Sequence, residues 1–351
     1  MMKLRSLHCI ALALSTFCLA LTPAQAAEFT PENPLIIKMT SFAMPTHPVV
    51  KDGFLPWGEE LKEKSGGRMI LELYNPNTIC PDADVYDCVK SGVIDMGAQV
   101  TQRVKGALPL SNIIDMPMMY PSAEVASKVF CQLLEEFPEL RAEYKDTKLF
   151  GGWSGAQFQF HTVKNPIHNI SDASGLKIGA ISASIVPIIQ SLGSAAVSVP
   201  MSDCYLSLQR GQVDAIVCPY AFVVSTKIYE ATNYSTTANL MGNGVYMCMN
   251  RDIYQSMPDD LRAILDETLN RERFELWGKV TDLGALNDIE TIKKAGQQIF
   301  ELSAEDIARG RELTRPVVDE WFADCEKRGQ GDVARKLYAR ATELVTQYSA
   351  Q

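Results

Sequence analysis

Short apolar runs alternate with stretches of helical periodicity over the first two thirds of the chain. Residues 35–43 and 69–74 are rich in apolar, β-prone side chains, which predicts two strands. Between them, apolar residues recur at helical spacing from Phe54 until Gly66 interrupts the pattern, which predicts a helix. Strands that alternate with helices are typical of a largely parallel sheet covered by helices.

One pattern occurs twice, at residues 84–99 and again at residues 203–218. In both copies an aspartate is followed by tyrosine at +2, glycine at +8 and a second aspartate at +11. Each copy predicts a helix that ends at its glycine, where a left-handed residue is favoured, and then a strand, at 94–99 and 213–218 respectively. A pattern repeated 119 residues later predicts two similar lobes.

The second lobe has its own series of predicted elements. Its strands are expected at 158–163, 176–181 and 195–199, with a helix at 184–192. The fold class is therefore α/β. We expect lobe I to span residues 27–152, with about 240–258 returning to it, and lobe II to span 153–239.

The final third of the chain is helical in pattern. No proline occurs between Pro258 and Gly296, and apolar residues recur there at three-, four- and seven-residue intervals. This predicts one long helix at 259–296, about 57 Å in length at 1.5 Å per residue, which would have to brace both lobes. Residues 297–351 are predicted to form C-terminal helices.

The first 26 residues have the features of an export signal. Lys3 and Arg5 precede an apolar run from Cys9 to Leu21, and Ala24-Gln25-Ala26 is a small-x-small cleavage pattern. The run is short for a membrane span, so we interpret residues 1–26 as a cleaved signal peptide and expect the mature chain in the periplasm.

Composition limits the partners and the redox chemistry. Beyond the signal, the chain has 31 basic and 42 acidic residues, which gives a net charge of −11. This negative charge argues against nucleic acid or an anionic membrane surface as a partner. Seven cysteines remain, an odd number without a CxxC pair, so no zinc site is expected. Cys80 and Cys88 are the best local candidates for a disulfide in an exported protein.

Enzyme motifs are not found. The segment from Gly152 to Ala156 is close to a nucleophile elbow, but its final glycine is replaced by alanine. The sequence contains no HExxH motif, phosphate loop or dinucleotide fingerprint. We therefore expect no catalytic residues, no metal and no cofactor.

Four segments together resemble a known family of transport proteins. They are SGGRMILELYNPN at 65–77, ISDASGLKIG at 170–179, SDCYLSLQRGQVDAIVCP at 202–219 and KIYEATNY at 227–234. With the export signal and the long helix, they resemble the solute-binding proteins of tripartite ATP-independent periplasmic (TRAP) transporters, the DctP-like family. The resemblance covers essentially the whole mature chain.

This resemblance implies a two-lobed periplasmic binding protein type II fold that closes on a small anion. Such a protein passes its ligand to the TRAP membrane permease subunits and touches the membrane only through them. Most of the family holds the carboxylate of an organic acid with an arginine that ends the GLKIR segment. This chain has Gly179 at that position, Gln159 where some members have a second arginine, and Cys218 where the family has asparagine.

Loss of the arginine predicts a change of ligand. A guanidinium matches a planar carboxylate with two parallel hydrogen bonds, whereas a tetrahedral sulfonate can be held by several neutral donors. The branch of the family that binds the two-carbon sulfonate isethionate lacks this arginine, so a small sulfonate such as isethionate is our leading hypothesis. Arg103 is the rival source of charge, and its entry into the cleft would make a carboxylate or a taurine-like zwitterion plausible again.

We expect the ligand contacts at strand ends that face the cleft, where Gln102 and Ser184 are among the candidate donors. Two alternatives stay open: a carboxylate-binding TRAP protein that uses Arg103, and a ligand sensor that serves a membrane receptor. The candidate ligand-binding residues are Thr40, Phe42, Gln99, Arg103, Trp153, Gln159, Gly179, Ser182, Met201, Cys218 and Tyr220.

Overall fold

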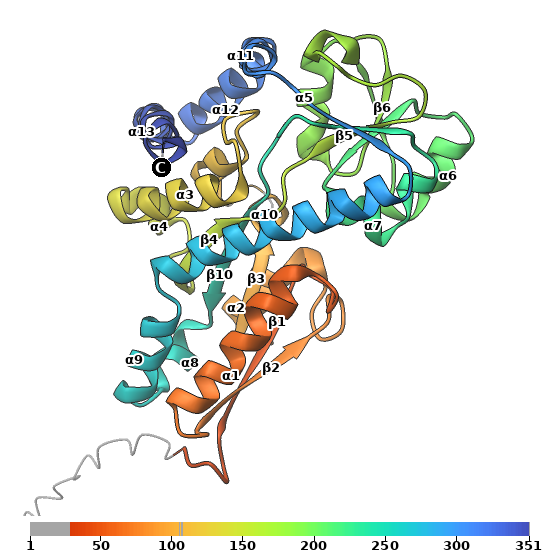
Figure 1. Cartoon of the computed structure of the whole chain (residues 1–351). Helices are drawn as coiled ribbons and strands as arrows, with labels where there is room; N and C mark the ends of the chain where they lie inside the picture. The colour runs from red at the N-terminus through yellow and green to blue at the C-terminus, as the bar shows by residue number, and fades with distance from the viewer. Residues whose placement is uncertain (1–28, 105, 107, 351) are drawn as a thin grey trace, which may run out of the picture.

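The computed structural model describes residues 29–104, 106 and 108–350, so the predicted export signal lies outside the described residues. Two mixed sheets, each covered by helices, form the two lobes (Figure 1). The first sheet has the order β2-β1-β3-β10-β4 and the second has the order β11-β9-β5-β8-β6-β7. The two-lobed α/β fold expected from the sequence is confirmed.

The first sheet is built from strands that are mostly far apart in the sequence. β1 pairs in parallel with β2 and β3, whereas β10 runs antiparallel between β3 and β4. Its strands are β1 Leu35–Ser41, β2 Met69–Tyr74, β3 Met96–Val100, β4 Lys148–Ser154 and β10 Gly244–Met249.

In the second sheet β6 pairs in parallel with β7 and β8, and β9 pairs in parallel with β11. β5 lies antiparallel between β8 and β9. Its strands are β5 Gln159–Thr162, β6 Lys177–Ala180, β7 Ala195–Ser198, β8 Ala215–Cys218, β9 Tyr234–Thr237 and β11 Gln298–Glu301.

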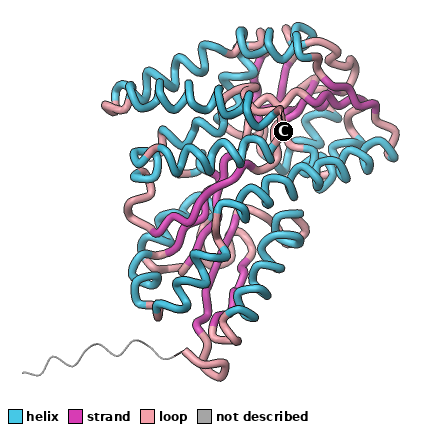
Figure 2. Tube along the Cα trace, turned by 60° about the vertical axis from the view of Figure 1, so that its left-hand side comes forward, coloured by secondary structure: helices cyan, strands magenta, loops and turns pink. Residues whose placement is uncertain are grey.

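Helices cover both faces of the sheets, and Figure 2 shows them wrapped around the strands. The described α-helices up to residue 256 are α1 Leu55–Lys64, α2 Val85–Ser91, α3 Ala123–Glu136, α4 Pro138–Ala142, α5 Val186–Ser191, α6 Cys204–Gln209, α7 Tyr220–Ser225 and α8 Arg251–Ser256. The C-terminal ones are α9 Asp259–Thr268, α10 Arg271–Lys294, α11 Ala304–Leu313, α12 Arg315–Lys327 and α13 Gly331–Ser349.

The doubled sequence pattern corresponds to equivalent structure in the two lobes. Asp95 precedes β3 and accepts a hydrogen bond from the backbone N–H of Lys38 at 2.7 Å. Asp214 precedes β8 and accepts the equivalent bond from Lys177 at 2.9 Å. Gly92 and Gly211 follow α2 and α6 with φ values of 75° and 65°, in the left-handed region. Each repeated aspartate thus ties its strand to the neighbouring parallel strand.

The prediction of one helix at 259–296 is wrong, because the structure divides this segment into α9 and α10. The break has a local cause: Asn270 leaves helical geometry, and its side chain accepts a hydrogen bond from the backbone N–H of Arg273, which starts a new helix. α10 packs against α3 of the first lobe and α7 of the second, so it does contact both (Figure 1).

The C-terminal region differs from the prediction in one place. Residues 298–301 form β11 at the edge of the second sheet, where helix was expected. Helices α12 and α13 then return to the first lobe and bury Trp321, Cys325 and Leu337 in a cluster with α3. The C-terminal segment therefore contributes to both lobes.

Two antiparallel segments connect the sheets next to α10. Residues 155–158 and 238–243 lie side by side, with backbone hydrogen bonds from Gly155 to Asn243 at 2.8 Å and from Phe158 to Met241 at 3.1 Å. Such paired crossings are the places where a two-lobed protein can bend. The space between the lobes opens beside them.

Candidate ligand-binding cleft

A cavity of about 570 Å³ lies between the lobes. Its volume is in the range typical of small-molecule sites. Residues from both sheets, the crossing segments and α12 surround it. They include Phe42, Val100, Gln102, Arg103, Asn112, Asp115 and Met116 from the first lobe, Ile181, Ser182, Ser184, Met201, Pro219 and Phe222 from the second, Phe158, Met241 and Asn243 from the crossings, and Val317, Glu320, Trp321 and Asp324 from α12.

The polar part of the cavity is formed by strand ends, as in other open α/β sheets. Gln102 and Arg103 lie in the turn that directly follows β3, and Ser182 and Ser184 lie in the turn after β6. The hydroxyls of Ser182 and Ser184 are 3.0 Å apart, and the Ser184 hydroxyl donates a hydrogen bond to the amide oxygen of Gln102. Neutral groups from both lobes therefore meet at one point of the cavity.

The basic group of the cavity is Arg103, whose side chain is 40% exposed. Its guanidinium forms an ion pair with Asp82, which is only 14% exposed. Burial lowers the pKa of Arg103, although the group stays charged at physiological pH. Among the described residues that line the cavity, Arg103 is the single cationic side chain.

Carboxylates also line the cavity. Asp115 is buried, accepts hydrogen bonds from the backbone N–H of Gly244 at 2.8 Å and from the Thr101 hydroxyl at 3.2 Å, and has a pKa raised by burial to about 6. Glu320 and Asp324 contribute from α12. An anion in this cavity must therefore be held by specific donors rather than by a positive field.

Four of the predicted contacts line the cavity: Phe42, Arg103, Ser182 and Met201. Phe42 is partly exposed beyond β1, and Met201 is 48% exposed after β7. Phe42 supplies an apolar surface to the cavity and Arg103 a cation. Ser182 supplies a hydroxyl and Met201 a flexible thioether. That these four bind the ligand stays a prediction, which their shared position supports.

Two predicted glutamines have their amides occupied elsewhere. Gln99 is buried in β3, and its amide donates to the backbone carbonyl of Asp82 at 2.9 Å. Gln159 is buried at the start of β5, where its amide donates to Asn239 at 2.7 Å and accepts from the backbone N–H of Ala238. Both stabilise loops beside the cavity instead of lining it.

The other predicted residues also lie outside the lining. Thr40 donates to the carbonyl of Tyr74 at 3.3 Å, and the Tyr220 hydroxyl is 2.8 Å from that of Thr237. The Cys218 carbonyl is 3.0 Å from a ring nitrogen of His161. Trp153 is fully buried in an aromatic cluster with Phe54, Phe274 and Trp277.

Gly179 has a packing role in the centre of β6. A Cβ atom built there would approach Cγ1 of Ile216 to 2.8 Å, which is closer than real side chains allow. Gly179 and Ile216 are register partners on neighbouring strands, so the absence of a side chain at Gly179 lets Ile216 fill this face of the sheet. A larger residue at position 179 would need a smaller partner.

Gln102 and Ser184, which the sequence offered as candidate donors at strand ends, both line the cavity, whereas other lining residues carry no sequence signal. Asp115, Asn243 and Trp321 come from a 3₁₀ turn, a crossing segment and α12, none of which carries a recognisable motif. Long-range folding alone brings these three together.

In the part of the chain that the structure describes, no group of three or more His, Cys, Asp or Glu side chains has the arrangement of a metal site. Within the same residues, no helix combines the length and apolar character needed to cross a membrane.

Sequence comparison gives one family and several relatives. The model of the DctP family, described as bacterial extracellular solute-binding protein, family 7, matches residues 39–324. The C4-dicarboxylate-binding periplasmic protein DctP of Rhodobacter capsulatus is 25% identical over 82% of this chain and 86% of its own length. The 2,3-diketo-L-gulonate-binding periplasmic protein YiaO of Escherichia coli is 22% identical over 73% of this chain and 84% of its own length.

Solved structures share the fold. A TRAP solute-binding protein from Rhodoferax ferrireducens, in complex with copurified benzoate, superposes with a TM-score of 0.80 at 24% identity and covers 90% of this chain and 99% of that chain. A TRAP periplasmic solute-binding protein from Desulfovibrio salexigens with bound orotic acid gives a TM-score of 0.72 at 23% identity, covering 88% of this chain and 99% of that chain.

Proposed function

Because the chain belongs to the DctP family of bacterial extracellular solute-binding proteins, we propose that its cleft takes a small sulfonate, with isethionate as the first candidate. The protein is a periplasmic solute-binding subunit of a TRAP transporter, binds a small organic anion and works with membrane permease components. It is not an enzyme. The proposal concerns the chemical class of the anion.

The observation that carries this proposal is the replacement of the clamping arginine by Gly179, in a strand position that Ile216 has closed. The hydroxyls of Ser182 and Ser184 and the amide of Gln102 converge nearby. Several neutral donors arriving from different directions suit the three oxygens of a sulfonate better than the two coplanar oxygens of a carboxylate.

The energetics are adequate for useful affinity. Each hydrogen bond to a charged group contributes about 1.5–3 kcal/mol net, so three or four of them approach the ~8 kcal/mol of micromolar binding. A sulfonate is permanently ionised, so its binding does not depend on its own protonation. We therefore expect micromolar affinity from local donors in an acidic protein.

A carboxylate with an apolar body is the second candidate function, because Arg103 lines the cavity together with Phe42, Phe158 and Phe222. The benzoate found in one structural neighbour is an acid of this kind. A two-carbon sulfonate would fill only part of a cavity of about 570 Å³ unless the lobes move closer together. This candidate needs Arg103 to leave Asp82 or to be shared with it.

A head-to-head titration separates the two candidates. A thermal-shift screen of the mature protein against isethionate, taurine, benzoate and succinate would select binders, since a ligand that binds only the folded state raises its stability. Calorimetry would then measure affinity. We expect isethionate to bind in the micromolar range and succinate weakly. Tight binding of benzoate or succinate with no heat from isethionate would exclude the sulfonate proposal.

A further inference from the structure

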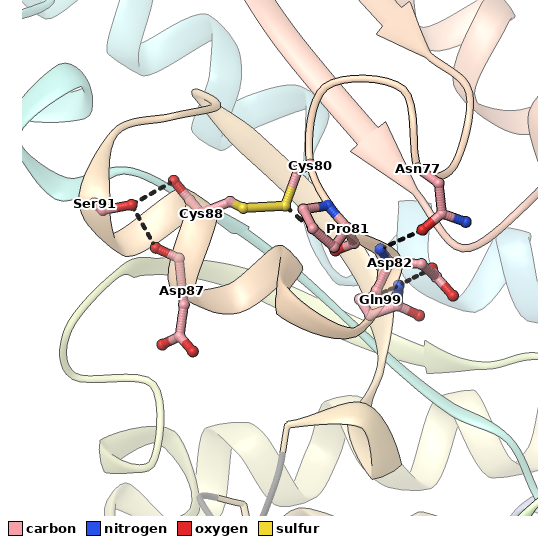
Figure 3. The surroundings of a disulfide bond; sticks show 8 residues. All are labelled: Asn77, Cys80, Pro81, Asp82, Asp87, Cys88, Ser91 and Gln99. Carbon is pink, nitrogen blue, oxygen red and sulfur yellow. Dashed lines mark hydrogen bonds between the residues drawn. A yellow bond between two sulfur atoms is a disulfide. The ribbon is translucent and has the colours of Figure 1, made fainter.

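The loop in front of α2 is fixed by a disulfide at the edge of the cleft. Cys80 and Cys88 form this bond between the loop and the helix (Figure 3). Within the loop, the side-chain oxygen of Asn77 accepts a hydrogen bond from the backbone N–H of Asp82 at 2.8 Å. The backbone around Asp82 is therefore held on both sides.

Asp82 directs both oxygens of its carboxylate toward groups at the end of β3. One oxygen accepts a hydrogen bond from the amide of Gln99, as Figure 3 shows, and the other pairs with Arg103. The backbone carbonyl of Asp82 also accepts from Gln99. Gln99 is 1% exposed, so a buried amide is committed to holding this acid in place.

The pairing changes the charge that the cavity presents. Arg103 is the one cationic side chain among the described lining residues, and Asp82 neutralises it without itself lining the cavity. Asp82 contacts one nitrogen of the guanidinium, so an entering carboxylate, which needs two N–H groups, would have to share the Arg103 charge with Asp82. A sulfonate held by Gln102, Ser182 and Ser184 competes instead with the hydrogen bond from Ser184 to Gln102, whose two partners carry no charge.

We propose that Asp82 is a specificity-determining residue, which withholds the guanidinium of Arg103 from a ligand in the cleft and so disfavours carboxylates relative to sulfonates. This inference rests on the proposed function, since it requires an anion in the cleft. The Cys80–Cys88 bond and Gln99 serve as positioning groups that keep the Asp82 carboxylate against Arg103.

The structure offers a matched control for Asp82. Asp84 lies two residues away in the same loop, is exposed and makes no side-chain cap bond to α2. Asp82→Asn and Asp84→Asn each remove one negative charge and keep the side-chain size, but only the first acts on a residue paired with Arg103. The difference between them isolates the pairing from the change in net charge.

Calorimetry with benzoate and isethionate on the mature wild type and both variants tests the inference. We expect Asp82→Asn to bind benzoate at least tenfold more tightly than Asp84→Asn does, and to change isethionate affinity by less than threefold. The double variant Asp82→Asn/Arg103→Gln should lose the gain in benzoate affinity. A benzoate affinity that is within twofold in Asp82→Asn and Asp84→Asn, with both variants folded by circular dichroism, would overturn it.

A second measurement needs no ligand and separates this inference from the proposed function. The rate of Arg103 modification by phenylglyoxal, followed by peptide mass spectrometry, reports how firmly Asp82 holds the guanidinium. We expect several-fold faster modification in Asp82→Asn, with Arg309 on α11 as an unchanged internal reference. An unchanged Arg103 rate would overturn the withholding role, whatever anion the wild type binds.

Discussion

Ser184 donates a hydrogen bond to the side-chain amide oxygen of Gln102 and so joins the two lobes across the cleft. Gln102 follows β3 of the first sheet, and Ser184 follows β6 of the second. Both line the cavity, and Ser182 lies 3.0 Å from the Ser184 hydroxyl. A ligand that closes the lobes would find this polar contact already in place.

Replacement of Gln102 by alanine should weaken ligand binding. The change removes the interlobe hydrogen bond and one candidate donor to the ligand, and a neutral hydrogen bond contributes about 0.5–1.5 kcal/mol, or about 1.5–3 kcal/mol where the partner is charged. We expect isethionate affinity to fall roughly 5- to 30-fold in calorimetry, because about 1–2 kcal/mol of binding free energy is lost.

The control for this change is Gln190→Ala on α5, where the glutamine is exposed and outside the cavity lining. It should leave affinity within twofold of wild type. An equal loss of affinity in the two variants would show that Gln102 has no special role in binding.

The repeated sequence pattern correctly predicted equivalent structure in the two lobes, because its residues act on their immediate neighbours. Asp95 and Asp214 bond the backbone of the adjacent parallel strand, and Gly92 and Gly211 adopt left-handed geometry after a helix. These interactions follow from a few neighbouring residues and one strand pairing. Position relative to the repeat was therefore enough to place strands and strand ends.

The direction of side chains could not be predicted with the same success. Gln99 and Gln102 are three residues apart, yet the first faces Asp82 and the second faces the cavity, since the strand continues to Val100 before the chain turns. A strand end misplaced by one residue moves side chains to the opposite face. Trp321 and Asp115 reach the cavity through packing of distant helices, which no local pattern records.

Restoration of the arginine at position 179 should be costly in this chain. Gly179→Arg would place a Cβ atom within 2.8 Å of Ile216, and overpacking of a well-packed site costs about 1–3 kcal/mol. We expect the free energy of unfolding in urea to fall by that amount.

A double-mutant cycle with Ile216→Ala checks the cause. The two changes should be coupled, with Gly179→Arg/Ile216→Ala more stable than the sum of the single effects predicts, because the smaller partner makes room. Additive effects, or a Gly179→Arg variant as stable as wild type, would mean that the Ile216 contact does not restrict this position.

Trp153 should affect stability and not ligand binding. Its indole is fully buried, its ring centroid lies 5.0 Å from that of Trp277, and its N–H has no partner in the described part of the protein. Trp153→Ala should cost about 3–5 kcal/mol of unfolding free energy. In Trp153→Phe, which keeps a ring in the cluster, isethionate affinity should stay within twofold of wild type. A tenfold loss of affinity in a stable Trp153→Phe protein would return this residue to the ligand site.

The buried carboxyl of Asp115 should make stability depend on pH. Burial raises its pKa in the folded protein from 3.8 to about 6, despite hydrogen bonds from Gly244 and Thr101. A raised carboxyl pKa means that the folded state favours the protonated form. This contribution to stability is therefore fully present below pH 3.8 and is lost as the pH rises through about 6.

Asp115→Asn removes this dependence, since a neutral amide occupies the site at every pH. Because the pKa rises from 3.8 to about 6, we expect the variant to exceed wild type in unfolding free energy at pH 8 by up to roughly 3 kcal/mol and to lose most of that advantage at pH 4.5. Urea unfolding at the two pH values measures the difference.

Glu320→Gln, at an exposed position of the same cavity, should change stability by less than about 0.5 kcal/mol at either pH. A stability difference for Asp115→Asn that is the same at pH 8 and pH 4.5 would contradict the assignment, because an uncharged packing effect does not vary with protonation.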